Sequence, residues 1–308
     1  MKPVLVDADT VHRTLPFATL IDDLDAAHRE QPAEIGRILL EKGDNGCLLL
    51  PAWQDGRALG AKLVTSFPGN GARGRPTVQG VYVLFDGCDG RPLAVIDGEA
   101  LTFRKTAADS ALGARYLARP DAHTLLMIGA GDLAPWLIEA HRCVRPDIER
   151  VLVWNRTGER AERLATLCGG EAVEDLDPAL AEADIISSAT GSLSPLIRGA
   201  LLRKGAHVDL VGGFTPRMRE CDDETVQRGS VFVDAPWSTV GIAGDLVQPM
   251  ESGAIDEQAI RGDLFDLATG RISGRSSLDE ITVFKNGGGA HLDLMTAMSL
   301  MQRMQETA

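Results

Sequence analysis

The spacing of apolar residues changes character near residue 108. Before this point, residues 10–29 are apolar at helical spacing, and extended apolar runs follow at 47–51, 60–66, 78–85 and 92–96. Asp86-Gly87 and Asp89-Gly90 separate the last two runs, which is typical of a β-hairpin. The first third therefore predicts a small α+β domain, residues 1–108, built on an antiparallel sheet.

Beyond residue 108, short runs rich in apolar residues alternate with helical segments. The runs fall at 124–128, 151–154, 184–188, 207–211 and 230–233. Runs without polar alternation are typical of parallel strands covered on both faces, so this region predicts a doubly wound α/β domain over 109–288. Residues 289–308 are again apolar at helical spacing, and we expect one helix that packs back on the first domain.

A glycine-rich turn follows the first of these predicted parallel strands. Gly129-x-Gly131-x-x-Ala134 lies between the run at 124–128 and a predicted helix that begins at Pro135. In this arrangement the first glycine permits a tight turn, the second admits a pyrophosphate, and the helix N-terminus attracts its charge. The turn predicts dinucleotide binding by Gly129, Gly131, Asp132 and Leu133.

The end of the second predicted strand bears on the choice between NAD and NADP. It reads Trp154-Asn155-Arg156-Thr157, with no carboxylate before Glu159, whereas NAD sites usually place Asp or Glu there. Asn155 and Thr157 can hydrogen-bond a 2′-phosphate, and Arg156 can pair with it. We therefore predict NADPH as the cofactor, with NADH possible; the alternative is an ordinary solvated loop.

Two more glycine-containing turns follow later strands of the same predicted sheet. Thr190 ends one strand, and Val211, Gly212 and Gly213 end the next. Ligands of open α/β sheets gather at the carboxyl ends of the strands, so we expect these residues to bind the cofactor as well. The alternative is that these are tight turns with no further role.

Composition narrows the function classes. The chain has 308 residues, 44% of them apolar and 24% charged, with a net charge of −13. Such a charge argues against nucleic acid or an anionic membrane as a partner. The chain has no apolar run of membrane-spanning length, no signal-peptide pattern at its start, and no CxxC pair or metal-ligand spacing among five cysteines and six histidines. We expect a cytoplasmic globular protein without a metal.

One stretch reverses the overall charge. Residues 62–105 carry six Lys and Arg against four Asp and Glu, while both flanks are acidic. Lys62 lies inside an apolar extended run, and Arg104-Lys105 precedes a segment of small residues, 106–113. These positions predict an anion site for a small carboxylate substrate beside the nicotinamide; the alternative is a set of surface basic residues without function.

Several ordered blocks together resemble the ornithine cyclodeaminase/μ-crystallin family over nearly the whole chain. They are Gly60-Ala-Lys-Leu-Val64, Gly74-Arg-Pro-Thr-Val78, Asp97-Gly98, Thr106-Ala-Ala, Gly129-Ala-Gly131, Gly244-Asp-Leu246 and Phe284-Lys-Asn286. The resemblance implies a Rossmann domain plus a smaller substrate-binding domain, whose sheet pairs with that of a second subunit to form a homodimer.

The resemblance also implies roles for single residues. Lys62 matches a lysine that contacts the substrate, and Lys105 stands where members usually have a substrate-binding arginine, so either Arg104 or Lys105 is expected to face the substrate. Thr77, Thr190 and Asn286 are expected to contact the cofactor. The substrate pocket is expected to include Phe214 as an apolar wall, Gly287, and His291, which is either a proton relay or a cap or packing residue.

One position departs from the cyclodeaminases. They carry an aspartate after the Val-Gly-Gly turn, and this chain has Phe214. The segments 211–220 and 285–291 instead resemble the branch that reduces cyclic ketimines with NADPH. That branch converts Δ1-pyrroline-2-carboxylate, and often Δ1-piperideine-2-carboxylate, to L-proline or L-pipecolate.

Three alternatives to this reductase remain at the level of sequence. The first is an ornithine cyclodeaminase that forms L-proline and ammonia with bound NAD. The second is a reductive aminase like alanine dehydrogenase, and the third is a non-catalytic NADPH-binding protein like μ-crystallin.

Overall fold

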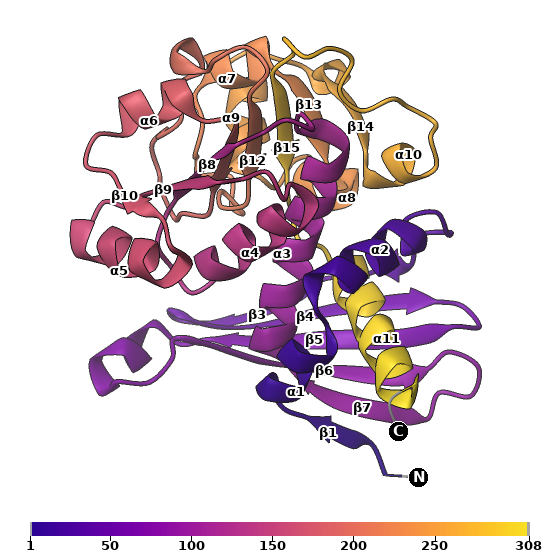
Figure 1. Ribbon diagram of the computed structural model, residues 1–308. Coiled ribbons are helices and arrows are strands. Elements are labelled where there is room, and N and C mark those ends of the chain that lie inside the picture. Colours follow the sequence, from indigo (N-terminus) through magenta and orange to yellow (C-terminus); the bar gives the residue numbers. More distant parts are fainter. Residues whose placement is uncertain (1, 307–308) are drawn as a thin grey trace. The chain divides into compact units, whose positions relative to one another are not determined.

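A computed structural model describes residues 2–306, which form two compact units (Figure 1). Unit 1 comprises the residues up to Lys105 together with those from Gly289 onward, and unit 2 is Thr106–Gly288. The division falls inside helix α3 (Gly98–Leu117). Arg104 and Lys105 therefore lie within a long helix, rather than ahead of a short one as the sequence suggested.

Unit 1 is built on a seven-stranded sheet with the order β1-β7-β6-β5-β4-β2 and with β3 beside β4. All its neighbours are antiparallel except β1 and β7, which are parallel. The short edge strands β1, β2 and β3 were not predicted, because exposed edge segments lack a clear apolar alternation. The strands are β1 (Val4–Val6), β2 (Glu34–Ile35), β3 (Ile38–Lys42), β4 (Asn45–Gln54), β5 (Ala58–Ser66), β6 (Val78–Asp86) and β7 (Pro92–Asp97).

The predicted helical stretch 10–29 is two helices, α1 (Ala8–Thr14) and α2 (Phe17–Ala27). They are separated at Pro16, which cannot donate a backbone hydrogen bond and so interrupts a continuous helix. Helix α11 (Ala290–Glu306) packs against α2, β4 and β5, and Figure 1 shows it in yellow across the sheet of unit 1. A short 3₁₀ segment, Pro68–Arg73, precedes β6.

Unit 2 is an eight-stranded, fully parallel sheet with the order β10-β9-β8-β11-β12-β15-β13-β14, which confirms the predicted doubly wound α/β fold. Strand β15, which lies near the centre of the sheet, and the edge strands β10 and β14 were not predicted. The strands are β8 (Thr124–Ile128), β9 (Arg150–Trp154), β10 (Glu171–Ala172), β11 (Ile185–Ser188), β12 (His207–Leu210), β13 (Ser230–Val233), β14 (Ile260–Asp263) and β15 (Thr282–Lys285).

Helices cover both faces of this sheet (Figure 1). On one face, Gly113 of α3 lies directly against the Phe284 ring, where a Cβ would come within 2.7 Å of it. On the other, alternate strand residues such as Leu126 and Val208 form an apolar core with Leu180 of α6. The helices are α4 (Ala134–Val144), α5 (Gly158–Cys168), α6 (Leu176–Glu182), α7 (Asp223–Arg228), α8 (Pro236–Thr239), α9 (Gly244–Glu251) and α10 (Leu264–Ala268), with 3₁₀ turns at Gly199–Leu201 and Glu257–Ala259.

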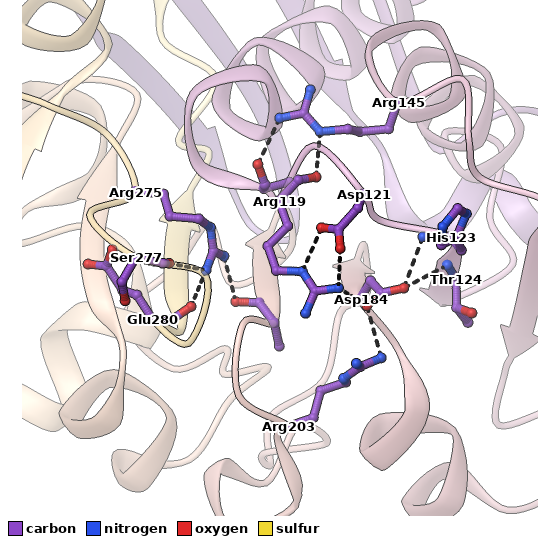
Figure 2. Close-up of polar contacts among 12 residues, drawn as sticks. Arg119, Asp121, His123, Thr124, Arg145, Asp184, Arg203, Arg275, Ser277 and Glu280 are labelled. Atoms are coloured by element: carbon purple, nitrogen blue, oxygen red, sulfur yellow. Dashed lines mark hydrogen bonds and ion pairs between the residues drawn. The ribbon is translucent and has the colours of Figure 1, made fainter.

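A network of arginines fastens the loops at the amino ends of these strands (Figure 2). Arg145 donates to four carbonyls at the end of α3, those of Ala114, Arg115, Ala118 and Arg119, at 2.8–3.0 Å. Asp184 accepts from the backbone N–H groups of His123 and Thr124 and from Arg203. Because these donors bind carbonyls and carboxylates of the protein itself, the network is a structural support at the edge of the sheet away from the phosphate turn.

Two structural findings bear on function classes. Among residues 2–306, no helix has the length and apolar composition needed to cross a bilayer. Within the same residues, no cluster of three or more His, Cys, Asp or Glu side chains is arranged to hold a metal ion.

Candidate active site

A cavity of about 320 Å³ opens at the carboxyl ends of β8, β9 and β11, within unit 2. It brings together six residues expected to bind the cofactor: Gly129, Gly131, Asn155, Arg156, Thr157 and Thr190. Arg160, on the first turn of α5, also lines the cavity and was not predicted. No carboxylate is among the described residues that line it.

The phosphate turn has the geometry that its glycines require. Gly129 adopts φ +101°, and a Cβ there would lie 2.6 Å from the Ala189 carbonyl oxygen, so no other residue fits. A Cβ at Gly131 would meet nothing within 4 Å, so the backbone at this position is open to an incoming group. Asp132 and Leu133 complete the turn, and Leu133 occupies the N-cap position of α4.

Asn155 holds two loops together. Its Oδ1 accepts from the Ala130 N–H at 3.2 Å, and its Nδ2 donates to the Thr157 carbonyl at 2.9 Å. Asn155 therefore braces the two loops, and the contact with a 2′-phosphate expected of it stays a prediction. Arg156 is exposed beside it, and the Thr157 side chain makes no capping bond to α5.

Thr190 is fixed by a buried carboxylate that the sequence reading did not identify. Its backbone N–H and its hydroxyl donate to Glu220 Oε1 at 2.7 and 2.8 Å, and the Ser188 hydroxyl donates to the same atom at 2.6 Å. Glu220 is completely buried, and this burial raises its pKa to about 7; the Lys285 charge opposes the shift and the Asp245 charge adds to it.

A second buried carboxylate supports the Val211–Gly213 turn. Asp245 Oδ1 accepts from the Glu220 N–H at 2.7 Å, and its Oδ2 lies 3.1 Å from Lys285 Nζ. Lys285 also donates to the Gly212 carbonyl. Gly213 is at φ +63°, and a Cβ there would collide with Asp245 Oδ2, so the turn requires a residue without a side chain.

Phe214 does not form the buried apolar wall that we expected. Its side chain is 61% exposed. The nearby acidic residues are engaged elsewhere. Asp222 caps α7 by accepting from the Thr225 N–H at 2.9 Å, and Asp223 pairs with Arg219.

The two residues that follow β15 differ in their surroundings. Asn286 is 3% exposed and donates through Nδ2 to the Thr106 carbonyl at 3.0 Å, while its Oδ1 has no hydrogen-bond partner among residues 2–306. Gly287 packs against α8, and a Cβ there would lie 2.5 Å from the Ser238 carbonyl oxygen. Close packing therefore accounts for the glycine at this position, and the substrate-pocket role expected for it stays a prediction.

Unit 1 contains a buried cluster of charged side chains. Lys62 Nζ, on β5, lies 3.0 and 2.9 Å from the two carboxylate oxygens of Asp293 on α11. Lys105 Nζ, on α3, lies 3.5 Å from Asp293 Oδ1 and 3.4 Å from the Gly289 carbonyl. The three side chains are at most 7% exposed. Asp293 was missed because the helical pattern of 289–306 gives no sign that one polar position faces inward.

Arg104 points away from this cluster. Its guanidinium donates to the His12 ring at 3.2 Å and to the His12 carbonyl at 3.0 Å, and it lies 4.5 Å from the centroid of the Phe17 ring. Adjacent positions on a helix project about 100° apart, which separates the two cations. Of the pair left open by the sequence, Lys105 is the one beside Lys62.

His291 is a packing residue within unit 1. It is fully buried, and its ring meets that of His28 edge to face at a centroid distance of 6.2 Å. Burial holds its pKa well below the ordinary value, so the ring is neutral near pH 7 and unsuited to the proton relay considered above.

Thr77, expected to contact the cofactor, is exposed just before β6, where its carbonyl accepts from the Phe67 N–H at 2.7 Å.

Several known proteins are similar to this chain in sequence or in structure. The Δ1-pyrroline-2-carboxylate reductase of Paracoccus denitrificans is 45% identical over 295 residues, which are 94% of this chain and 93% of that protein. Among solved structures, the Thermococcus litoralis reductase of the same name, in complex with NADH and L-proline, superposes with a TM-score of 0.91 at 30% identity and covers 99% and 98% of the two chains. An archaeal alanine dehydrogenase dimer with bound NAD also gives 0.91, at 25% identity, over 100% and 97%.

The family model described as "Ornithine cyclodeaminase/mu-crystallin family" matches residues 2–308, nearly the entire chain. The blocks that carried the resemblance lie in both units, from Lys62 on β5 to Asn286 after β15. The chain therefore belongs to the ornithine cyclodeaminase/mu-crystallin family.

Proposed function

We propose that this protein is an NAD(P)H-dependent reductase that converts Δ1-pyrroline-2-carboxylate to L-proline. The observation that carries the proposal is the buried pair of ammonium groups, Lys62 and Lys105, within 3.5 Å of the single carboxylate of Asp293. Such a pair suits a small anionic substrate, and reductases of this name are similar to the chain over nearly its whole length.

The residues of unit 2 fit a nicotinamide dinucleotide. Gly129 and Gly131 form a turn open to a pyrophosphate ahead of α4, and the cavity beside them has about the volume of a ligand site. Asn286 presents a buried oxygen without a partner among the described residues. When bound, the reduced cofactor supplies a hydride to the imine carbon.

The chain's own residues then bind the substrate carboxylate, orient the ring and keep the imine nitrogen protonated. Lys62 and Lys105 bind the substrate carboxylate and fix the ring, which contributes to rate through orientation. The positive charge of Lys62 lies in a buried site where electrostatic interactions are strong. Because a protonated imine becomes an amine on receiving a hydride, the ammonium group of Lys62 would also serve to keep the imine nitrogen protonated.

Cyclodeamination is the less favoured function. The resemblance places an aspartate of the cyclodeaminases at the position of Phe214, which is exposed and cannot accept a proton. Asp222, Asp223 and Asp245 are each committed to a helix cap or an ion pair. These three aspartates are therefore engaged with protein groups, and Phe214 offers no carboxylate to act on the amine of ornithine.

The proposal is tested by following NADPH oxidation with Δ1-pyrroline-2-carboxylate and identifying L-proline as the product. Parallel reactions with pyruvate plus ammonia test reductive amination, and the piperideine analogue tests the larger ring. Faster turnover of pyruvate with ammonia, or cofactor binding without turnover of any ketimine or keto acid, would replace the proposal by one of the alternatives.

We expect a preference for NADPH over NADH of about tenfold or more in kcat/KM, the effect of one good charge-assisted contact to a phosphate. Arg156 and Arg160 both line the cavity, and no described lining residue is acidic. Arg156→Ala should raise the KM for NADPH about tenfold and leave that for NADH nearly unchanged. Equal changes for the two cofactors would contradict this role.

We further propose that the protein forms a homodimer through the outer face of the unit 1 sheet. The side of the sheet opposite to Lys62 carries apolar residues on neighbouring strands, and several are strongly exposed: Leu5 (80%), Leu40 (60%), Ile38 (51%), Trp53 (49%) and Val81 (42%). An apolar sheet face of this kind is normally covered by another sheet or subunit. The archaeal alanine dehydrogenase neighbour is a dimer.

Placing a charge on this face should dissociate the dimer. We expect Val81→Lys to weaken association at least about tenfold, since a buried lysine at an interface lacks a partner. Leu167→Lys on α5, where Leu167 is 72% exposed, serves as the matched control. Light scattering after size exclusion measures the mass, and a wild-type monomer at micromolar concentration would refute the dimer.

A further inference from the structure

The buried network around Asp209 determines how Asn286 is oriented. Asn286 Nδ2 donates to the Thr106 carbonyl and to the Ser110 hydroxyl, each at 3.0 Å. A carbonyl oxygen only accepts, so the nitrogen of the amide must be the atom on that side. The oxygen Oδ1 is therefore on the opposite side, where it is buried and without a partner among the described residues.

Ser110 links the Asn286 amide to the carboxylate of Asp209. Its hydroxyl lies 2.8 Å from Asp209 Oδ1, and a hydroxyl has one proton to give. Because that proton goes to Asp209, the Ser110 oxygen can act only as an acceptor toward Asn286. The direction of every hydrogen bond from Asn286 to Asp209 is thus fixed.

Asp209 itself is held from two further elements. Its Oδ2 accepts from the Ser187 hydroxyl on β11 at 2.7 Å and contacts His141 Nε2 on α4 at 3.1 Å. Asp209, Ser187 and His141 have no exposed surface. A fully buried carboxylate is costly unless several donors satisfy it, so its presence at the centre of the sheet calls for a role beyond packing.

We propose that Asp209 is a positioning residue for the cofactor. Acting through Ser110, it orients the Asn286 amide so that Oδ1 accepts a hydrogen bond from the carboxamide N–H of the nicotinamide. The inference rests on the cofactor part of the proposed function. It does not depend on which imine is reduced, because the groups involved all belong to unit 2.

A ligand that lacks only this N–H provides the test. The Kd of NADP⁺ and of its 3-acetylpyridine analogue, in which a methyl group replaces the amide nitrogen, is measured by isothermal titration calorimetry on the intact protein. We expect wild type to bind NADP⁺ about tenfold more tightly than the analogue, the effect of one hydrogen bond to an otherwise unpaired buried oxygen. Asn286→Ala should reduce this ratio to about one.

The positioning residues are then tested by the same ratio. Asp209→Asn and Ser110→Ala should each lower it to about threefold or less, because the Asn286 amide is no longer held in one orientation. Ser187→Ala removes a hydrogen bond to Asp209 that is not part of the chain Asp209–Ser110–Asn286. This variant should keep the wild-type ratio of the two Kd values. Should Asp209→Asn fail to fold, Ser110→Ala decides, since it leaves the other contacts of Asp209 in place.

The outcomes separate this inference from the proposed reaction. A wild-type ratio near one, or wild-type ratios in folded Ser110→Ala and Asp209→Asn, would overturn the positioning role even if the ketimine is reduced. Discrimination that is lost in these variants supports the role even in a protein that reduces no ketimine, a result that would refute only the proposed reaction.

Discussion

Replacing Lys62 with alanine is expected to lower kcat/KM for Δ1-pyrroline-2-carboxylate about a hundredfold, the usual scale for truncating one member of a buried charge pair. The lysine is paired with Asp293 at 2.9–3.0 Å, and its side chain is 7% exposed. Its loss removes a cation from the substrate site and leaves the Asp293 carboxylate to repel the substrate carboxylate. Steady-state NADPH oxidation measures the effect.

Two comparisons make this result specific. Lys204→Ala removes a lysine that is 78% exposed and pairs with Asp279 on the surface, and it should change kcat/KM little. The Kd of NADPH in Lys62→Ala should match wild type, because Lys62 is not among the residues that line the dinucleotide cavity. A kcat/KM within a factor of about two of wild type would remove Lys62 from the site.

The second large effect concerns the pH dependence of stability. Burial raises the pKa of Glu220 to about 7 in the folded protein, from an ordinary value of 4.5. A raised carboxyl pKa contributes stability below the unfolded value, and this contribution is lost as the pH rises through the folded value. Glu220 therefore makes wild type less stable at pH 8 than at pH 5, other groups being equal.

Glu220→Gln should remove this dependence and keep an oxygen that can accept from Ser188 and Thr190. Between pH 5 and pH 8, we expect the free energy of unfolding to shift in favour of the variant by on the order of 2 kcal/mol. Urea denaturation at both pH values measures the shift. Glu224→Gln, at an exposed position of α7, is the matched control. Parallel pH profiles for wild type and Glu220→Gln would contradict the account.

The sequence predicted the parts of the fold that have strong periodic patterns. The buried parallel strands β8, β9 and β13 and helix α11 lie where apolar spacing indicated them, and Gly129 of the phosphate turn has the positive φ that a tight turn requires. β15 was harder to predict. Its apolar pattern includes Lys285, which is buried because Asp245 pairs with it.

Site residues could be predicted where the local sequence marks them as unusual. They could not be predicted where their burial depends on tertiary contacts. Lys62 could be identified because a lysine inside an apolar strand is unusual. Asp293, Glu220 and Asp209 could not, because each is an acidic residue whose burial is decided by partners far away in the sequence. The same limitation left Arg104 and Lys105 unresolved until the faces of α3 were known.

The central claim, that the chain reduces a cyclic ketimine and does not cyclise ornithine, is tested most directly by one paired assay. Purified protein is given Δ1-pyrroline-2-carboxylate with NADPH, or L-ornithine with NAD, and the oxidised cofactor, ammonia and L-proline are measured. We expect one NADPH oxidised per L-proline formed from the ketimine, and no ammonia from ornithine. Ammonia release from ornithine without net consumption of cofactor would contradict the account.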